Sequence, residues 1–100
     1  MTTPNDRDKQ RITNLLDATK TVTFSGGHHF EAPITTTTHE LARRLHLTEY
    51  RAQRLIDEMI ETGEIIKRGF VMFTDESTYA ASAAAERAHA ANATGQEVTQ

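Results

Sequence analysis

Apolar residues recur at helical spacing in two adjacent segments near the middle of the chain. Leu41, Ala42 and Leu45 form a first stripe, and a longer stripe at spacings of three and four follows between Glu49 and Thr62. The longer stripe consists of Ala52, Leu55, Ile56, Met59 and Ile60. The pattern predicts two short amphipathic helices joined by a tight turn.

Residues that favour helix ends stand at the expected boundaries. Thr37 followed by Glu40 fits the capping box, in which a hydroxyl and a carboxylate satisfy free backbone amides reciprocally. Thr48 is the expected N-cap of the second helix. Gly63 can adopt the left-handed conformation that ends it. Both helices therefore have a start signal, and the second also has a stop signal.

After Gly63 the pattern changes to the apolar runs of a short hairpin. Residues 64–66 and 70–73 flank the turn signal Lys67-Arg68-Gly69, which predicts a basic tip. Lys67 and Arg68 could contact a sugar-phosphate backbone. They could instead only protect an exposed strand edge, as cations do in many sheets.

The amino-terminal third predicts one helix and one further hairpin. Residues 6–20 carry Ile12, Leu15 and Leu16 at helical spacing, whereas residues 1–5 are expected to be disordered. In residues 21–33, two strand-like runs flank Ser25-Gly26-Gly27. Residues 34–36 are then expected to pair with the hairpin that follows Gly63.

The carboxy-terminal segment is rich in alanine, the best helix former. A helix is expected within residues 75–95, capped by Ser77 or Thr78 and stopped by Gly95, with a flexible tail at 96–100. Because alanine buries little area, such a helix gains stability mainly by close packing against another helix. We expect it to dimerise; a frayed tail is the alternative. The expected contact face is Tyr79, Ala80, Ala83, Ala84, Ala88 and Ala91.

The outward face of the helix at 49–62 suggests what the chain binds. Tyr50, Arg51, Gln53 and Arg54 project from its first half, and acidic residues occupy its second half. In helix-turn-helix proteins the start of the recognition helix meets the base edges. Arginine can pair with guanine and glutamine with adenine. Ordinary salt bridging within the helix would explain the same charges.

The order of these elements resembles the winged helix-turn-helix superfamily over roughly residues 6–74. The resemblance implies a mostly α-helical fold with a three-helix core, a small antiparallel sheet with a hairpin wing, and here an added C-terminal helix. It implies base reading by Tyr50, Arg51, Gln53 and Arg54. The residues expected at the DNA backbone are Thr37, Arg43, Arg44, Thr48, Lys67 and Arg68. The stretch 21–33 is longer than the usual link.

Composition narrows the class of protein. One hundred residues form one domain, and 37% hydrophobic content suits a globular unit. The absence of cysteine removes disulfides and a thiolate nucleophile. No long apolar segment or secretory signal is visible, so a cytoplasmic protein without membrane contact is expected.

Charge is the main objection to DNA binding. The formal net charge is −3, from 11 basic and 14 acidic residues, whereas affinity for DNA rests largely on neutralised phosphates. Basic residues nevertheless gather between Arg43 and Arg68. We therefore expect weak binding by one copy and a homodimer as the binding unit.

Metal binding and catalysis have little support in the residues. Adjacent His28 and His29 would point to opposite faces of a strand and could not easily share an ion. Asp57, Glu58 and Glu61 are spaced as a solvated helical face. We expect no cofactor and no enzymatic activity. The expected function is a dimeric, sequence-specific regulator of transcription that binds double-stranded DNA and acts as a repressor. The alternative is a winged-helix adaptor or inhibitor, of phage or plasmid type, that binds a protein through its acidic surface.

Overall fold

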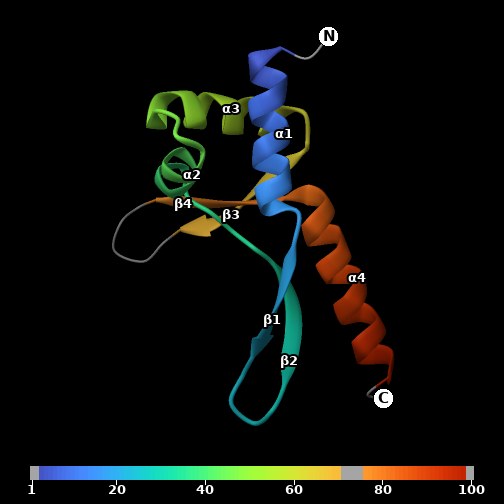
Figure 1. Ribbon diagram of the computed structural model, residues 1–100. Coiled ribbons are helices and arrows are strands. Elements are labelled where there is room, and N and C mark those ends of the chain that lie inside the picture. The colour runs from blue at the N-terminus through green and yellow to red at the C-terminus, as the bar shows by residue number, and fades with distance from the viewer. Residues whose placement is uncertain (1–2, 71–75, 99–100) are drawn as a thin grey trace.

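Four helices and two antiparallel hairpins make up the part of the chain that the structure describes. The structure is a computed structural model that describes residues 3–70 and 76–98 (Figure 1). The elements are α1 (Pro4–Leu16), β1 (Thr19–Thr23), β2 (His29–Pro33), α2 (Thr38–Leu45), α3 (Glu49–Glu61), β3 (Ile65–Phe70), β4 (Ser77–Ala81) and α4 (Ser82–Val98). The expected class, helices with small antiparallel sheets, is confirmed.

The apolar stripes of α1, α2 and α3 meet in one core. Ile12, Leu41, Leu55, Ile56 and Met59 are fully buried there, and the same cluster takes in residues of β3 and β4. Burying each such side chain contributes about 1.5–3 kcal/mol relative to exposure. One member of the predicted stripe differs, because Ile60 is 38% exposed.

α1 begins and ends earlier than the apolar spacing indicates. Thr3 accepts a hydrogen bond from the Asp6 backbone N–H, and the Asp6 carboxylate accepts one from the Thr3 N–H. This capping box starts the helix at Pro4, so the expected disorder of residues 1–5 is wrong for residues 3–5, and residues 1–2 lie outside the described part. At the other end Thr19 already pairs in β1, which prevents extension to Lys20.

The expected additional hairpin is present as β1 and β2. Its strands pair antiparallel from Thr19 with Pro33 to Thr23 with His29. Gly26 and Gly27 adopt positive φ angles of 94° and 85° in the turn, which explains the two glycines. Phe24 and Phe30 stack near the turn with ring centroids 5.1 Å apart.

The second hairpin corrects the prediction of a basic tip. β3 continues through Lys67 and Arg68, and its partner is β4, which begins only at Ser77. Lys67 pairs with Tyr79 and Gly69 with Thr78, so Arg68 is an extra residue at a register shift in the strand. The cations therefore lie along the strand. The expected second strand at 71–73 lies outside the described residues.

The expected pairing of residues 34–36 with this hairpin is reduced to one bridge. Thr36 and Tyr79 exchange backbone hydrogen bonds of 3.0 and 2.8 Å. This bridge ties the segment before α2 to β4.

The C-terminal helix starts later than expected. Residues 77–81 pair with β3, so Tyr79 and Ala80 are strand residues, and α4 runs on past Gly95. Tyr79, Ala80, Ala84 and Ala88 are buried within the chain, whereas Ala83 and Ala91 are exposed. The expected dimerisation face is therefore wrong in its main members, because the chain's own core covers them.

The elements form a body and an arm (Figure 1). The body comprises α1, α2 and α3 with β3 and β4. The arm comprises β1, β2 and α4, which run side by side away from the body. Asn92 of α4 accepts from the Glu31 N–H at 2.7 Å and donates to the Glu31 carbonyl at 2.9 Å. None of the described helices combines the length and apolar character needed to cross a membrane.

Candidate nucleic-acid interface

The turn between α2 and α3 fixes how the second helix is presented. His46 adopts the left-handed conformation at the end of α2, with φ of 58°. Thr48 then caps α3 by accepting a hydrogen bond from the Arg51 N–H at 3.1 Å. His39 and Glu49, in the first turns of the two helices, hydrogen-bond at 2.6 Å. The Thr48 cap and the contact between His39 and Glu49 thus both hold the start of α3 in place.

Two of the predicted base-reading residues stand outward together. The Tyr50 side chain is 74% exposed, and the Arg54 guanidinium carbon lies 5.9 Å from the centre of the Tyr50 ring. Because these residues are four apart, they share one helical face. The cation above the ring forms an exposed, partly pre-oriented donor group on the first half of α3.

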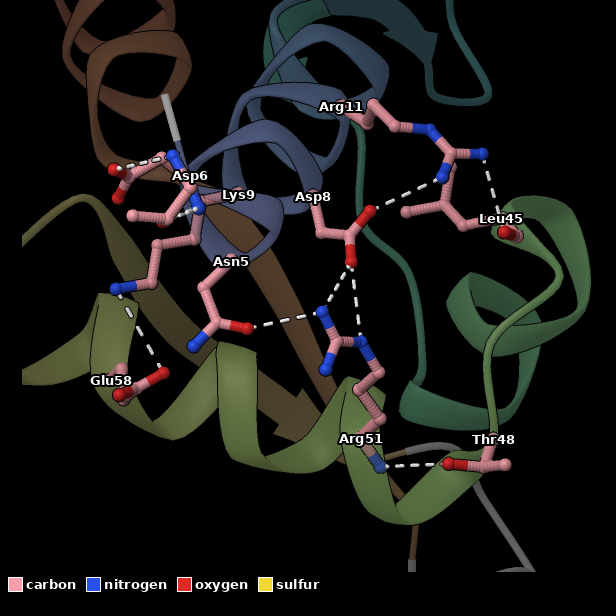
Figure 2. A network of polar contacts seen from close by, with 10 residues as sticks. Asn5, Asp6, Asp8, Lys9, Arg11, Leu45, Thr48, Arg51 and Glu58 are labelled. Atoms are coloured by element: carbon pink, nitrogen blue, oxygen red, sulfur yellow. Dashed lines mark hydrogen bonds and ion pairs between the residues drawn. The ribbon is translucent and has the colours of Figure 1, made fainter. Parts of the chain in front are cut away.

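Arg51, predicted to project outward, instead faces α1 (Figure 2). Its guanidinium donates to Asp8 Oδ2 at 2.7 and 3.2 Å and to Asn5 Oδ1 at 3.0 Å. The outward orientation is therefore wrong. The expectation failed because the partner carboxylate comes from a helix far away in the sequence.

Asp8 is the neighbour of Arg51 that sequence reasoning missed. It is only 8% exposed, although it is charged, and Arg11 also donates to it at 3.3 Å. The hydrogen bond from Arg51 holds the pKa of Asp8 below its ordinary value; burial opposes this effect, and Arg11 adds to it. No local pattern distinguishes Asp8 from other acidic residues of an amphipathic helix, so no signal in the sequence could have identified it.

The same region ties α1 to both other helices of the body. Arg11 donates to the Leu45 carbonyl at the end of α2 at 3.2 Å. Lys9 lies 3.8 Å from the Glu58 carboxylate of α3 (Figure 2). These contacts fix the orientation of α3 relative to α1 and α2.

Gln53 is also engaged within the chain. Its side-chain oxygen accepts from the Thr38 hydroxyl at 2.6 Å, and its amide nitrogen donates to Asp57 at 2.9 Å. The residue is half-buried between α2 and β4. It would have to give up these bonds to read a base.

The predicted backbone contacts fall at separate places. Arg43 and Arg44 both donate to Glu40, at 3.3 and 2.9 Å, and these hydrogen bonds lower the pKa of Glu40, the one from Arg44 most. Arg44 lines a pocket with Lys20 instead of joining Arg54. The hydroxyl oxygens of Thr37 and Thr48 accept the hydrogen bonds that cap α2 and α3, which uses an acceptor position and not the O–H donor. Exposed Lys67 and Arg68 lie on β3.

The first half of α3 and one end of the β3–β4 hairpin lie on one side of the molecule. In Figure 1 the start of α3 lies on the left, the side toward which β3 ends and from which β4 begins. The arm points elsewhere. Within residues 3–70 and 76–98, no group of three histidine or acidic side chains is placed to hold a metal ion.

Comparison with known proteins gives no further guide. No protein-family model, no curated protein and no solved structure matches the chain.

Proposed function

We propose that the chain binds double-stranded DNA as a winged helix-turn-helix domain, with the first half of α3 in the major groove. The observation that carries this proposal is the exposed pair of Tyr50 and Arg54 on a capped helix start. The order of helices and strands, with the bridge from Thr36 to Tyr79, supports the same reading. A helix presented in this way fits the width of the major groove.

The contacts suggest three roles for the residues that the sequence places at DNA. Arg54 is free of ion pairs among the described residues, so it is the proposed base reader, with Tyr50 beside it. Arg51 and Gln53 position α3 through their bonds to α1 and α2. The proposed phosphate contacts are Thr37, Arg43, Arg44, Thr48, Lys67 and Arg68.

Charge sets how such a protein would work. With a net charge of −3 and two arginines paired to Glu40, a single copy neutralises few phosphates. Two copies on adjacent half-sites would double the number of phosphate contacts with the same residues. We therefore propose a dimeric regulator that represses by occupying its operator.

A selection of duplexes from a random pool, read by gel shift at low salt, tests the proposal. The wild-type chain should enrich a defined motif with an affinity that falls steeply as salt rises. Arg54→Ala should weaken binding by about 1–3 kcal/mol and relax specificity at one position. Arg87→Ala, on the arm, is the matched control and should bind as wild type. A folded wild-type chain that enriches no motif would overturn the proposal.

A second candidate function is protein binding through the acidic half of α3. Arg43 and Arg44 pair with Glu40, so these arginines do not balance the acidic side chains of α3. The exposed Asp57 and Glu61 therefore favour this candidate. This candidate predicts no retention on duplex DNA. It also predicts that Glu61→Lys, and not Arg54→Ala, abolishes capture of a basic partner.

A further inference from the structure

The outer edge of β1 carries backbone groups with no partner in the described part of the chain. The Ile34 N–H donates to the Ala18 carbonyl at 3.2 Å and the Phe24 N–H to the His28 carbonyl at 2.7 Å. Hydrogen-bonded and non-bonded pairs alternate along an antiparallel ladder. The register therefore turns the N–H and C=O groups of Thr19, Thr21 and Thr23 away from β2. β1 has β2 as its only strand neighbour among the described residues.

The opposite edge of the same hairpin, along β2, is blocked at its centre. The Asn92 side chain of α4 pairs with both backbone groups of Glu31, as a neighbouring strand would. Pro33, at the end of β2, has no N–H to offer. The β2 edge is thus blocked by the chain itself at Glu31 and Pro33, whereas the β1 edge is open to addition of a strand.

We propose that a second copy of this chain adds to the open edge, with β1 pairing antiparallel to the partner's β1 and a two-fold axis at Thr21. The two hairpins then form one four-stranded sheet. In this register Thr21 faces the partner's Thr21, Thr19 faces the partner's Thr23, and Lys20 faces the partner's Val22. The outward backbone N–H and C=O groups of all three threonines form hydrogen bonds in this register, because each outward threonine lies opposite an outward threonine of the partner.

Charge and side-chain type select this register and this occupant. A shift of the axis to Lys20 would set the two lysines directly opposite each other, which is destabilising, and would leave Thr23 unpaired. The centred register avoids this and sets threonine opposite threonine, a favourable cross-strand pair. The segment Thr-Lys-Thr-Val-Thr is rich in β-branched residues, which suit strands. The edge is therefore complementary to a copy of itself.

This inference names the interface of the proposed dimer, but it does not depend on DNA binding. In an antiparallel arrangement the two bodies lie at opposite ends of the joined sheet, because the arm projects away from α3 (Figure 1). If the proposed function holds, the spacing of the two half-sites is set by the joined sheet and not by contact between the two bodies.

Sedimentation without DNA tests the interface. The wild-type chain should dimerise at micromolar concentration. Thr21→Pro removes the outward N–H and should weaken the dimer at least about tenfold, since the bond is lost in both copies. Thr21→Val is the matched control: it also loses the hydroxyl bond to Glu31, but it keeps the N–H and should dimerise as wild type. Circular dichroism should show both variants folded. A monomeric wild-type chain, or a Thr21→Pro dimer of unchanged strength, would overturn the inference.

Single cysteines test the register, and the chain has no cysteine of its own. Hydrogen-bonded opposite residues lie about 5.5 Å apart at Cα, within the range of a disulfide. Thr21→Cys should therefore form a disulfide-linked dimer in mild oxidant. Thr19→Cys and Thr23→Cys should not do so alone, but should link to each other when mixed. Equal linking at all three positions, or none from Thr21→Cys, contradicts the register. None of these results changes if the duplex selection fails.

Discussion

At the scale of single residues, the carboxylate of Asp8 organises the body. It accepts hydrogen bonds from arginines of two helices, at 2.7 Å from Arg51 and 3.3 Å from Arg11. Arg11 continues to the end of α2 through the Leu45 carbonyl. The role of Asp8 is therefore to position α3, and Arg51 supplies the contact from α3 through which it does so.

Asp8→Asn should destabilise the fold by about 1–3 kcal/mol, because it weakens charge-assisted hydrogen bonds from two arginines to a side chain that is only 8% exposed. Urea unfolding at neutral pH measures this loss. Asp57→Asn, an exposed acid on α3, is the matched control and should change the free energy of unfolding by less than about 0.5 kcal/mol. Equal effects of the two variants would contradict the role of Asp8.

The stabilisation from Asp8 should depend on pH with a defined sign. Because its folded-state pKa is lowered, the contribution is fully present above the ordinary Asp value of about 3.9 and is lost as pH falls through the lower folded value. The difference in unfolding free energy between wild type and Asp8→Asn should therefore be constant near neutral pH and shrink in acid. Glu40, whose pKa is also lowered, is present in both proteins and cancels. A difference that persists unchanged at the lowest pH would contradict this assignment.

Arg51 and Arg54 should separate stability from binding. Arg51→Ala should lower the free energy of unfolding by about 1–3 kcal/mol, since it removes the contacts to Asp8 and Asn5. Arg54→Ala should leave that free energy nearly unchanged, because its side chain is exposed. Thermal unfolding of both variants decides the point. A larger loss from Arg54→Ala would contradict the division of roles.

At the scale of elements, local signals were predictable and distant pairings were not. The helices at 38–45 and 49–61 follow from their caps and stripes, since Thr37, Thr48 and the apolar residues act within a few positions. Residues 77–81 look helical by composition. They form β4 because β3 and Thr36 offer strand partners, and tertiary pairing overrides propensity.

The candidate site shows the same limit. The shared face of Tyr50 and Arg54 could be predicted from helical spacing alone. The reorientation of Arg51 could not, because its partner lies 43 residues earlier in the chain. The turn signal at Lys67 and Arg68 was overridden in the same way by pairing with residues of β4.

Asn92 should hold the arm together. Asn92→Ala removes both hydrogen bonds to Glu31 and should destabilise the packing of α4 on β2 by about 1–2 kcal/mol. Hydrogen exchange should show faster exchange of the Glu31 amide, with little change at Ile56 in the body. His89→Ala, on the exposed face of α4, is the control. Unchanged protection at Glu31 would contradict this role.

At the scale of the whole molecule, our two proposals assign different tasks to the body and the arm. The body presents α3 on one side, while the arm carries the open strand edge away from it (Figure 1). In this proposal the chain has a net negative charge and each copy makes only a small basic contact with DNA. Dimerisation through the arm doubles that contact. The proposed activity depends on the body, and the proposed assembly depends on the arm.

Amide chemical shifts recorded while a selected duplex is added test the central claim most directly. The account predicts that the largest changes fall on residues 49–54 of α3, with further changes at the proposed phosphate contacts Thr37, Arg43, Arg44, Lys67 and Arg68, and little change along the exposed face of α4 beyond Ala83. It is contradicted if the duplex leaves residues 49–54 unmoved, or if the changes are confined to the acidic half of α3 or to the arm.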